Sequence, residues 1–209
     1  MMSKRLLAML AAVALSSTAH AQQPATIGQV EKVEQQAVAV TAGQSREMTA
    51  NGPIYFKDMI RTGEQSRLEA KLADDTVLTL GENGKITVDE FVYRPGRQGG
   101  KLGLNVVRGA FLFVGGKIEG PTGGNVTIKT AAGTLGVRGT TVWGGQIDGG
   151  YGVLVLDGLV TLKTRRGSVT MSKGQGTMLY AGRKPEAAAP WPEDRTKRAV
   201  ASISFSPGR

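Results

Sequence analysis

The clearest structural signal in this sequence is residues 153–163, which read VLVLDGLVTLK. Two runs rich in aliphatic and β-branched residues, typical of strands, flank the dipeptide Asp157-Gly158. Because Asp and Gly tolerate the positive φ angles of a two-residue turn, the stretch predicts a β-hairpin, or a tight corner in a β-solenoid. Both alternatives make this part of the chain β-structure.

Alternation of apolar and polar residues extends this signal along the chain in both directions. It is found in residues 68–72, 86–89, 102–106 and 126–129. Turn residues separate the runs, at residues 74–75, 81–84, 94–96, 115–116, 123–124 and 148–150. Residues 29–40 fit a helix face or a strand, and we expect a strand. The pattern predicts an all-β fold of short antiparallel strands, arranged as a β-sandwich or a short β-solenoid.

The first residues predict where the chain is sent. Lys4 and Arg5 precede an apolar stretch at residues 6–15, and the small-residue site Ala19-His20-Ala21 follows. This is the pattern of a secretory signal peptide, which we expect to span residues 1–21 and to be cleaved before Gln22. The expected location is the periplasm. No segment of the mature chain is expected to cross a membrane, because its longest apolar run is only residues 110–114.

The C-terminal part differs in composition from the body. From Arg183 onward the chain is rich in Pro, Ala and charged residues. We therefore expect one all-β domain over residues 22–182, followed by a tail at residues 183–209 that is mobile or loosely docked. A short helix around residues 194–202 is one option for the tail. Trp191 or Phe205 could hold it against the body.

The sequence argues against catalysis. It has no cysteine, and its only histidine is His20 in the signal peptide. The mature chain therefore lacks the residues for Ser-His-Asp or Cys-His catalysis and for the usual zinc sites. Asp74 and Asp75 lie at an expected turn, where carboxylates are ordinarily solvated. We expect no catalytic residues, no metal, no cofactor and no enzymatic activity.

The charge balance indicates anionic partners. The formal net charge is +9, or +7 without Lys4 and Arg5. Nucleic acid is not expected as the partner, because export removes the chain from it and no aromatic residues are interleaved with the basic ones. An acidic protein surface or an anionic envelope polymer fits the charge better.

Several segments, in order, resemble the FecR domain family. They are residues 60–68 (IRTGEQSRL), 72–81 (LADDTVLTLG), 107–113 (VRGAFLF), 135–140 (LGVRGT), 153–160 (VLVLDGLV) and 173–176 (KGQG). The resemblance extends over residues 52–179. Well-known members are regulators that sense an outer-membrane transporter and act on a cytoplasmic sigma factor. The cleavable signal departs from that plan, so this chain resembles the stand-alone secreted members.

The resemblance implies a non-catalytic periplasmic module for protein interaction or sensing, an accessory in envelope signalling. Its expected partner is a periplasmic or membrane protein. The alternative is a structural or polysaccharide-binding envelope protein, held by its basic surface to an anionic polymer.

The repeated Val-Arg-Gly tripeptide supplies the candidate site residues. They are Arg108, Gly109, Gly136, Arg138, Gly139 and Thr140. We expect a structural role, in which the glycines shape similar corners and Arg138 donates to nearby carbonyls or a carboxylate. The alternative makes Arg138 a bidentate ligand for an anion.

Tyr151 lies in the glycine-rich segment at residues 148–152. One carboxylate is too few to hold calcium there, so the segment predicts a turn. Tyr151 would then be an exposed contact residue or a lid on the core.

Overall fold

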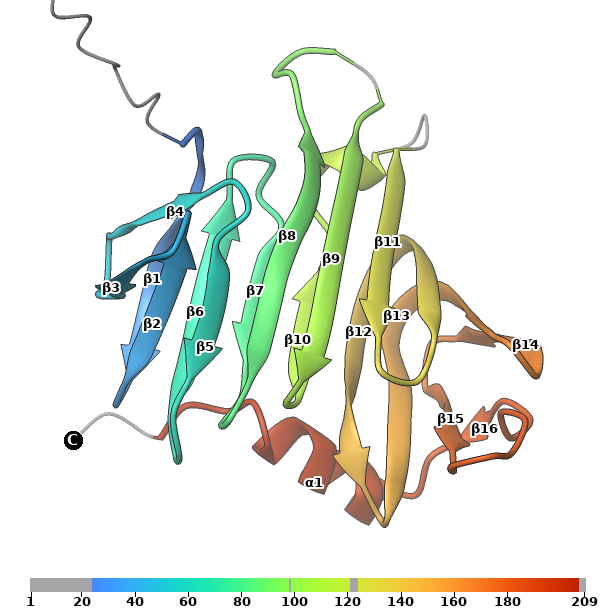
Figure 1. The fold of residues 1–209 in the computed structure, drawn as a ribbon. Coiled ribbons are helices and arrows are strands. Elements are labelled where there is room, and N and C mark those ends of the chain that lie inside the picture. Colours follow the sequence, from blue (N-terminus) through green and yellow to red (C-terminus); the bar gives the residue numbers. More distant parts are fainter. Residues whose placement is uncertain (1–23, 98, 121–123, 207–209) are drawn as a thin grey trace, which may run out of the picture.

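The computed structural model describes residues 24–97, 99–120 and 124–206, and the predicted signal peptide lies outside them. Almost all regular structure in the described residues is β-strand (Figure 1). The first strands are β1 (Thr26–Glu34), β2 (Ala37–Thr41), β3 (Gln44–Glu47), β4 (Pro53–Tyr55), β5 (Met59–Thr62), β6 (Arg67–Leu72), β7 (Val77–Leu80) and β8 (Lys85–Val92). The all-β prediction is confirmed, including strands rather than a helix at residues 29–40.

The remaining strands surround two short helical elements. They are β9 (Lys101–Arg108), β10 (Phe111–Val114), β11 (Asn125–Thr130), β12 (Thr134–Ile147), β13 (Gly150–Thr164), β14 (Gly167–Ser172), β15 (Gln175–Leu179) and β16 (Ala189–Pro190). A 3-10 turn, η1 (Lys117–Glu119), follows β10, and the α-helix α1 (Glu193–Ala201) follows β16. No helix among the described residues is long and apolar enough to span a membrane.

The strands form one open sheet that curls so that its two halves face each other. The order is β3-β2-β5-β8-β9-β11-β12-β10-β7-β6-β1-β4, with β13 to β16 branching from β12. Figure 1 looks through both halves, so that β5 lies over β6 and β8 over β7. Ile60 from one half and Leu68 and Phe111 from the other share a buried core between them. The alternating burial of β6 and β9 shows why the period-two pattern predicted this arrangement.

One strand pair departs from the predicted antiparallel pattern. β9 and β11 run parallel, with Leu102 opposite Val126 and Leu104 opposite Ile128. Between them the chain crosses to the other half of the sheet as β10 and returns through η1. A crossover of this kind brings the chain back in the same direction, as parallel pairing requires.

The hairpin predicted at Asp157-Gly158 is wrong. Both residues lie inside β13, which continues to Thr164. The turn instead falls at Asp148 and Gly149, with φ angles of 48° and 73°, and Ile147 pairs with Gly150 across it. At Gly158, where φ is 82°, the pairing with β12 shifts register, so this dipeptide forms a bulge. β13 changes partner there, from β15 before the bulge to β14 after it.

The described part of the C-terminal tail is docked on the outer face of β12 and β13. The helix expected near residues 194–202 is present as α1. Trp191 packs edge-on against Trp143 with ring centroids 5.9 Å apart, and Ala199 and Ile203 complete a small buried cluster with Leu154. Of the two aromatic residues expected to hold the tail, Trp191 therefore contacts the body. Phe205 lies 5.8 Å from the Lys32 ammonium.

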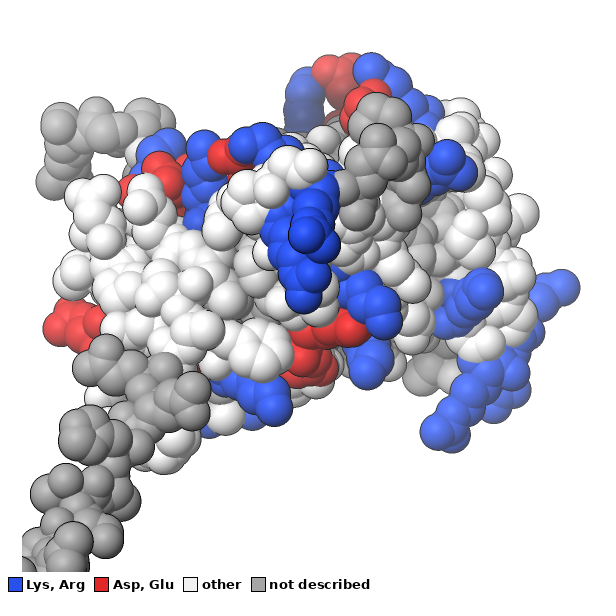
Figure 2. Space-filling view, turned by 90° about the horizontal axis from the view of Figure 1, so that it is seen from above, with Lys and Arg blue, Asp and Glu red and all other residues white. Residues whose placement is uncertain are grey.

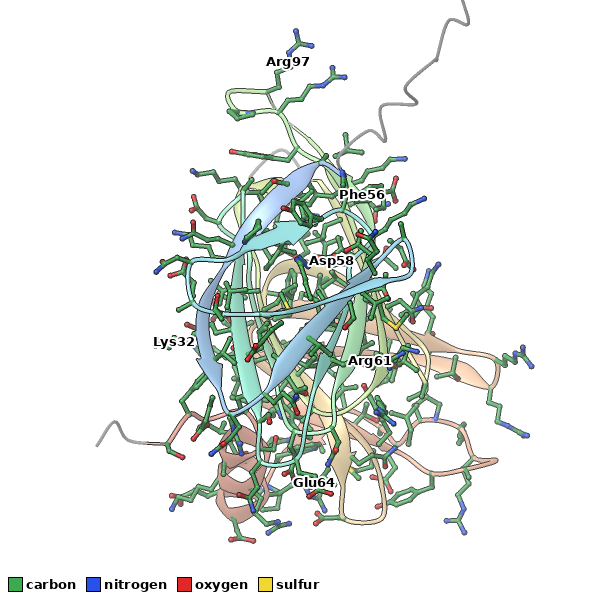
Figure 3. The ribbon with its side chains drawn as sticks, turned by 60° about the vertical axis from the view of Figure 1, so that its left-hand side comes forward. Lys32, Phe56, Asp58, Arg61, Glu64 and Arg97 are labelled. Carbon is green, nitrogen blue, oxygen red and sulfur yellow. The ribbon has the colours of Figure 1, made fainter. Side chains whose placement is uncertain are left out.

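A buried ion pair fastens the open edge of the curled sheet. Asp58 is fully buried and binds the Arg46 guanidinium and the Thr41 hydroxyl, and the Tyr55 N–H donates to it at 2.8 Å. Figure 3 places Asp58 inside this end of the fold, whereas Arg97 projects far out on the loop between β8 and β9. A buried charge needs such partners, so Asp58 is structural.

Candidate functional site

Gly109 and Gly139 both adopt the left-handed backbone region, but their surroundings differ. Gly109 has a φ of 85°, and a Cβ placed on it would lie 2.5 Å from the Gly84 Cα. Gly139 has a φ of 58°, and a Cβ there would meet no atom within 4 Å. Gly109 therefore permits backbone to pack on backbone where the chain leaves β9. Gly139 lies in the bulge of β12, opposite Gly158.

Thr140 stabilises that bulge. The residue is buried, and its hydroxyl accepts from the Arg138 N–H at 2.8 Å and donates to the Leu159 carbonyl at 3.3 Å. Its own N–H donates to Glu119 Oε2 at 3.0 Å, which joins the bulge to η1. The motif threonine thus satisfies backbone groups on both strands of the bulge.

The donor role expected for Arg138 is not seen among the described residues. Val137 faces the core, so the pleat directs Arg138 outward, and the side chain is exposed. Arg108 is exposed in the same way at the end of β9. Among the described residues, neither guanidinium makes a hydrogen bond or an ion pair. Gly136 is also exposed on β12, with open space beside it.

Tyr151 is a lid on the core, and its alternative role as an exposed contact residue is wrong. It is 8% exposed and packs with the main core cluster. Burial raises the pKa of the phenol to about 12, above its ordinary value of about 10. Its hydroxyl is buried away from solvent, near the Thr130 side chain.

Of the two carboxylates expected to be solvated at the turn after β6, one is buried and one is at the surface. Asp74 is fully buried, where it accepts from the Thr76 hydroxyl at 2.8 Å. Asp75 does lie at the surface, and ion pairs with Lys117 and Lys71 lower the pKa of its carboxyl. Burial raises the pKa of Glu119 above its ordinary value, against the opposing effect of the Thr140 N–H. These contacts join η1 to the β6–β7 turn and the β12 bulge.

A large hollow in the described surface lies at a different place, which we call the basic groove. It has a volume of about 1000 Å³ and lies between the β11–β12 loop, the β13–β14 hairpin and the segment after β15, over Tyr151. Its lining includes five basic side chains and no acidic one: Lys129, Lys163, Arg165, Arg166 and Arg183. At the lower right of Figure 2, over the end of the sheet that carries β14, blue groups gather without red ones.

The cations of the basic groove lack the partners that most other basic residues have. Arg46, Lys71, Lys117, Arg195 and Arg198, among others, form ion pairs with nearby carboxylates. No ion pair joins any of the five groove cations to a carboxylate in the part of the chain that the structure describes. All five side chains are exposed. The groove therefore has a positive potential that no described carboxylate neutralises, and this potential attracts external anions.

Sequence reasoning missed the basic groove. The motif residues do not line it; among the candidates only Tyr151 does. A signal was present in Lys163-Thr164-Arg165-Arg166-Gly167, two adjacent arginines at what proves to be a hairpin tip. The other cations lie many residues away from this segment in the sequence, and strand pairing brings them to the groove.

Comparison with known proteins agrees with the motif analysis. Residues 58–161 match the family described as FecR protein. The resemblance to the FecR domain family is therefore confirmed. No curated protein matches the chain.

Two crystal structures from Parabacteroides distasonis ATCC 8503, both of a "putative anti-sigma factor", share the fold. The structure at 2.50 Å resolution has a TM-score of 0.55 and 12% sequence identity, covering 68% of this chain and 63% of that one. The structure at 1.65 Å resolution has a TM-score of 0.53 and 12% identity, covering 68% and 64%. The match thus spans less than two thirds of each of the two crystallised chains, and at this identity it shows the fold alone.

Proposed function

We propose that this chain, which carries a FecR domain at residues 58–161, is a non-catalytic interaction or sensory module of the periplasm that serves envelope signalling by binding a protein partner. The observation that carries the proposal is the basic groove, an open hollow of about 1000 Å³ lined by cations and no acid. Long-range attraction to an acidic partner is what such a surface supplies.

The fold comparison supports a protein as the partner. The structures that share the fold are both described as a "putative anti-sigma factor", a description that implies a protein partner for them. Cation-lined, open surfaces suit steering and recognition, whereas catalytic sites gather nucleophiles, bases and convergent donors. The mature chain has no His or Cys for such a site. The export pattern at residues 1–21 supports the periplasm as the place of action.

Site-specific photo-crosslinking in cells tests this proposal. A crosslinking amino acid replaces Arg166 in the groove or, as a control, Arg97 on the β8–β9 loop, which is equally exposed and lies outside the groove. We expect one discrete protein adduct from position 166 and none of that mass from position 97. Absence of any protein adduct at position 166, or identical adducts at both positions, contradicts the proposal.

A second candidate function is binding to an anionic cell-wall polymer. The lack of ion pairs at the groove cations favours it as well, because a polyanion would neutralise them. Sedimentation with purified cell wall that is lost at raised salt would support this function. Protein that stays in the supernatant at low salt would exclude it.

A further inference from the structure

The basic groove is built from loops of several strands and not from one charged segment. Lys129 lies at the end of β11, Lys163 at the end of β13, and Arg183 follows β15. Arg165 and Arg166 form the tip of the β13–β14 hairpin. Cations from separate elements thus converge on a hollow far larger than a single phosphate or carboxylate needs. This spread suits a ligand with several negative charges along its length.

The sheet edge beside the groove favours a peptide over a sugar chain. Among the described strands, β14 pairs only with β13, so its other edge has no strand partner. An open edge offers backbone N–H and C=O groups to an extended peptide, which can pair with them as an added strand. A polysaccharide has no backbone that can continue the ladder. The edge begins next to Arg165 and Arg166, so an added strand would bring its acidic side chains close to these two groove cations.

The groove also offers aromatic ring surface. Tyr151 lines it, although its hydroxyl is fully buried and so cannot reach a bound ligand. Tyr180 also lines the groove and is half-buried. We infer that the basic groove binds an extended, acidic segment of the partner protein alongside β14. This inference rests on the proposed function and names the chemistry of the partner.

The test measures binding of a fluorescent hexaglutamate peptide by anisotropy at low salt. The variant R165A/R166A removes two groove charges at an exposed hairpin tip. The matched control R94A/R97A removes two exposed charges from the β8–β9 loop, outside the groove. We expect R165A/R166A to weaken binding by about tenfold or more, the scale of two lost charged contacts, and R94A/R97A by about twofold or less. Thermal melts check that both variants are folded.

Two results would overturn the inference. Equal losses in the two variants would mean that overall charge, and not the groove, attracts the peptide. Tighter binding of an oligogalacturonate with the same number of carboxylates would assign the groove to an acidic sugar chain.

The crosslinking experiment separates this inference from the proposed function. A protein adduct that persists unchanged in R165A/R166A, together with no hexaglutamate binding, would refute the groove inference and leave the proposed function standing. Groove-dependent hexaglutamate binding without a protein adduct would support the groove chemistry and refute the proposed function.

Discussion

The tripeptide Val-Arg-Gly occurs twice, at residues 107–109 and 137–139, and the two copies do different things. Both place an arginine outward and a glycine at positive φ. At Gly109 the chain crosses from one half of the sheet to the other and presses against the Gly84 backbone. At Gly139 the chain continues along β12 through a bulge, in which the Cβ position of the glycine opens onto free space. The shared tripeptide therefore indicates a positive φ angle at its glycine, whereas the packing around that glycine depends on residues elsewhere in the chain.

The largest difference between the copies should appear when each glycine becomes alanine. Gly109→Ala adds both the strain of positive φ and a Cβ 2.5 Å from the Gly84 Cα, so it should lower the free energy of unfolding by about 3 kcal/mol or more. Gly139→Ala adds only the strain, about 1 kcal/mol. Denaturant unfolding of both variants measures the gap. Equal losses would show that crowding at Gly109 is relieved by movement of the 81–84 turn.

Removing the Thr140 hydroxyl tests what holds the second copy in place. Thr140→Val should cost about 2 kcal/mol, because the Arg138 N–H and the Leu159 carbonyl lose a buried partner while the side-chain shape is kept. Thr170→Val, which removes an exposed hydroxyl bonded to Thr161, is the control and should change stability far less. A similar loss in the two variants would contradict a special role for Thr140 in the bulge.

Through the carboxyl of Glu119, the second copy should make the free energy of unfolding depend on pH, whereas the first copy should not. Burial raises the pKa of this carboxyl in the folded state, so the folded protein holds this proton more tightly than the unfolded chain does. The resulting penalty is absent at pH values below the unfolded pKa of about 4.3 and grows as pH rises through the folded pKa. Wild type should therefore lose stability relative to Glu119→Gln as pH rises. Melts in paired buffers measure this, and a difference that does not change with pH would exclude it.

The smallest effect is expected from the arginines. Arg138→Ala and Arg108→Ala should each change the free energy of unfolding by within about 0.5 kcal/mol, because both side chains are exposed and lack described partners. Chemical denaturation of the two variants checks this. A loss above about 1 kcal/mol in Arg138→Ala alone would restore the donor role that the sequence suggested for it.

Local patterns in the sequence predicted the strands well and predicted their connections less well. Period-two alternation fixes which side chains face the core, so β6, β8, β9 and β11 could be anticipated from the sequence. The two Asp-Gly dipeptides show the limit. Residues 148–149 form the hairpin turn, whereas residues 157–158 form a bulge inside β13. The reason is that β12 pairs with β13 on both sides of residues 157–158. That long-range pairing leaves no mark on either dipeptide.

The candidate site was harder to predict for a similar reason. The motif glycines and Thr140 gave a correct indication of unusual backbone, since such residues report local conformation. The basic groove depends on which loops the curled sheet brings to one end. Lys129 belongs to β11 and Arg183 follows β15, and β12 and β13 lie between these two strands in the sheet. Nothing in the residues next to Lys129 or Arg183 indicates that the two share a surface. The net charge of the sequence predicted an anionic partner but did not predict where on the protein it binds.

The docked helix α1 has a consequence for how the chain matures. Trp143 and Leu154 belong to strands that are synthesised well before Trp191, Ala199 and Ile203, which cover them. Until those later residues emerge and close on the sheet, a nascent chain presents an uncovered tryptophan-lined surface, the kind that holdase chaperones and unwanted self-association both select. Completion of the fold is thus timed by the synthesis of residues 191–203, and premature termination before residue 191 would yield a sheet that is assembled yet prone to aggregate.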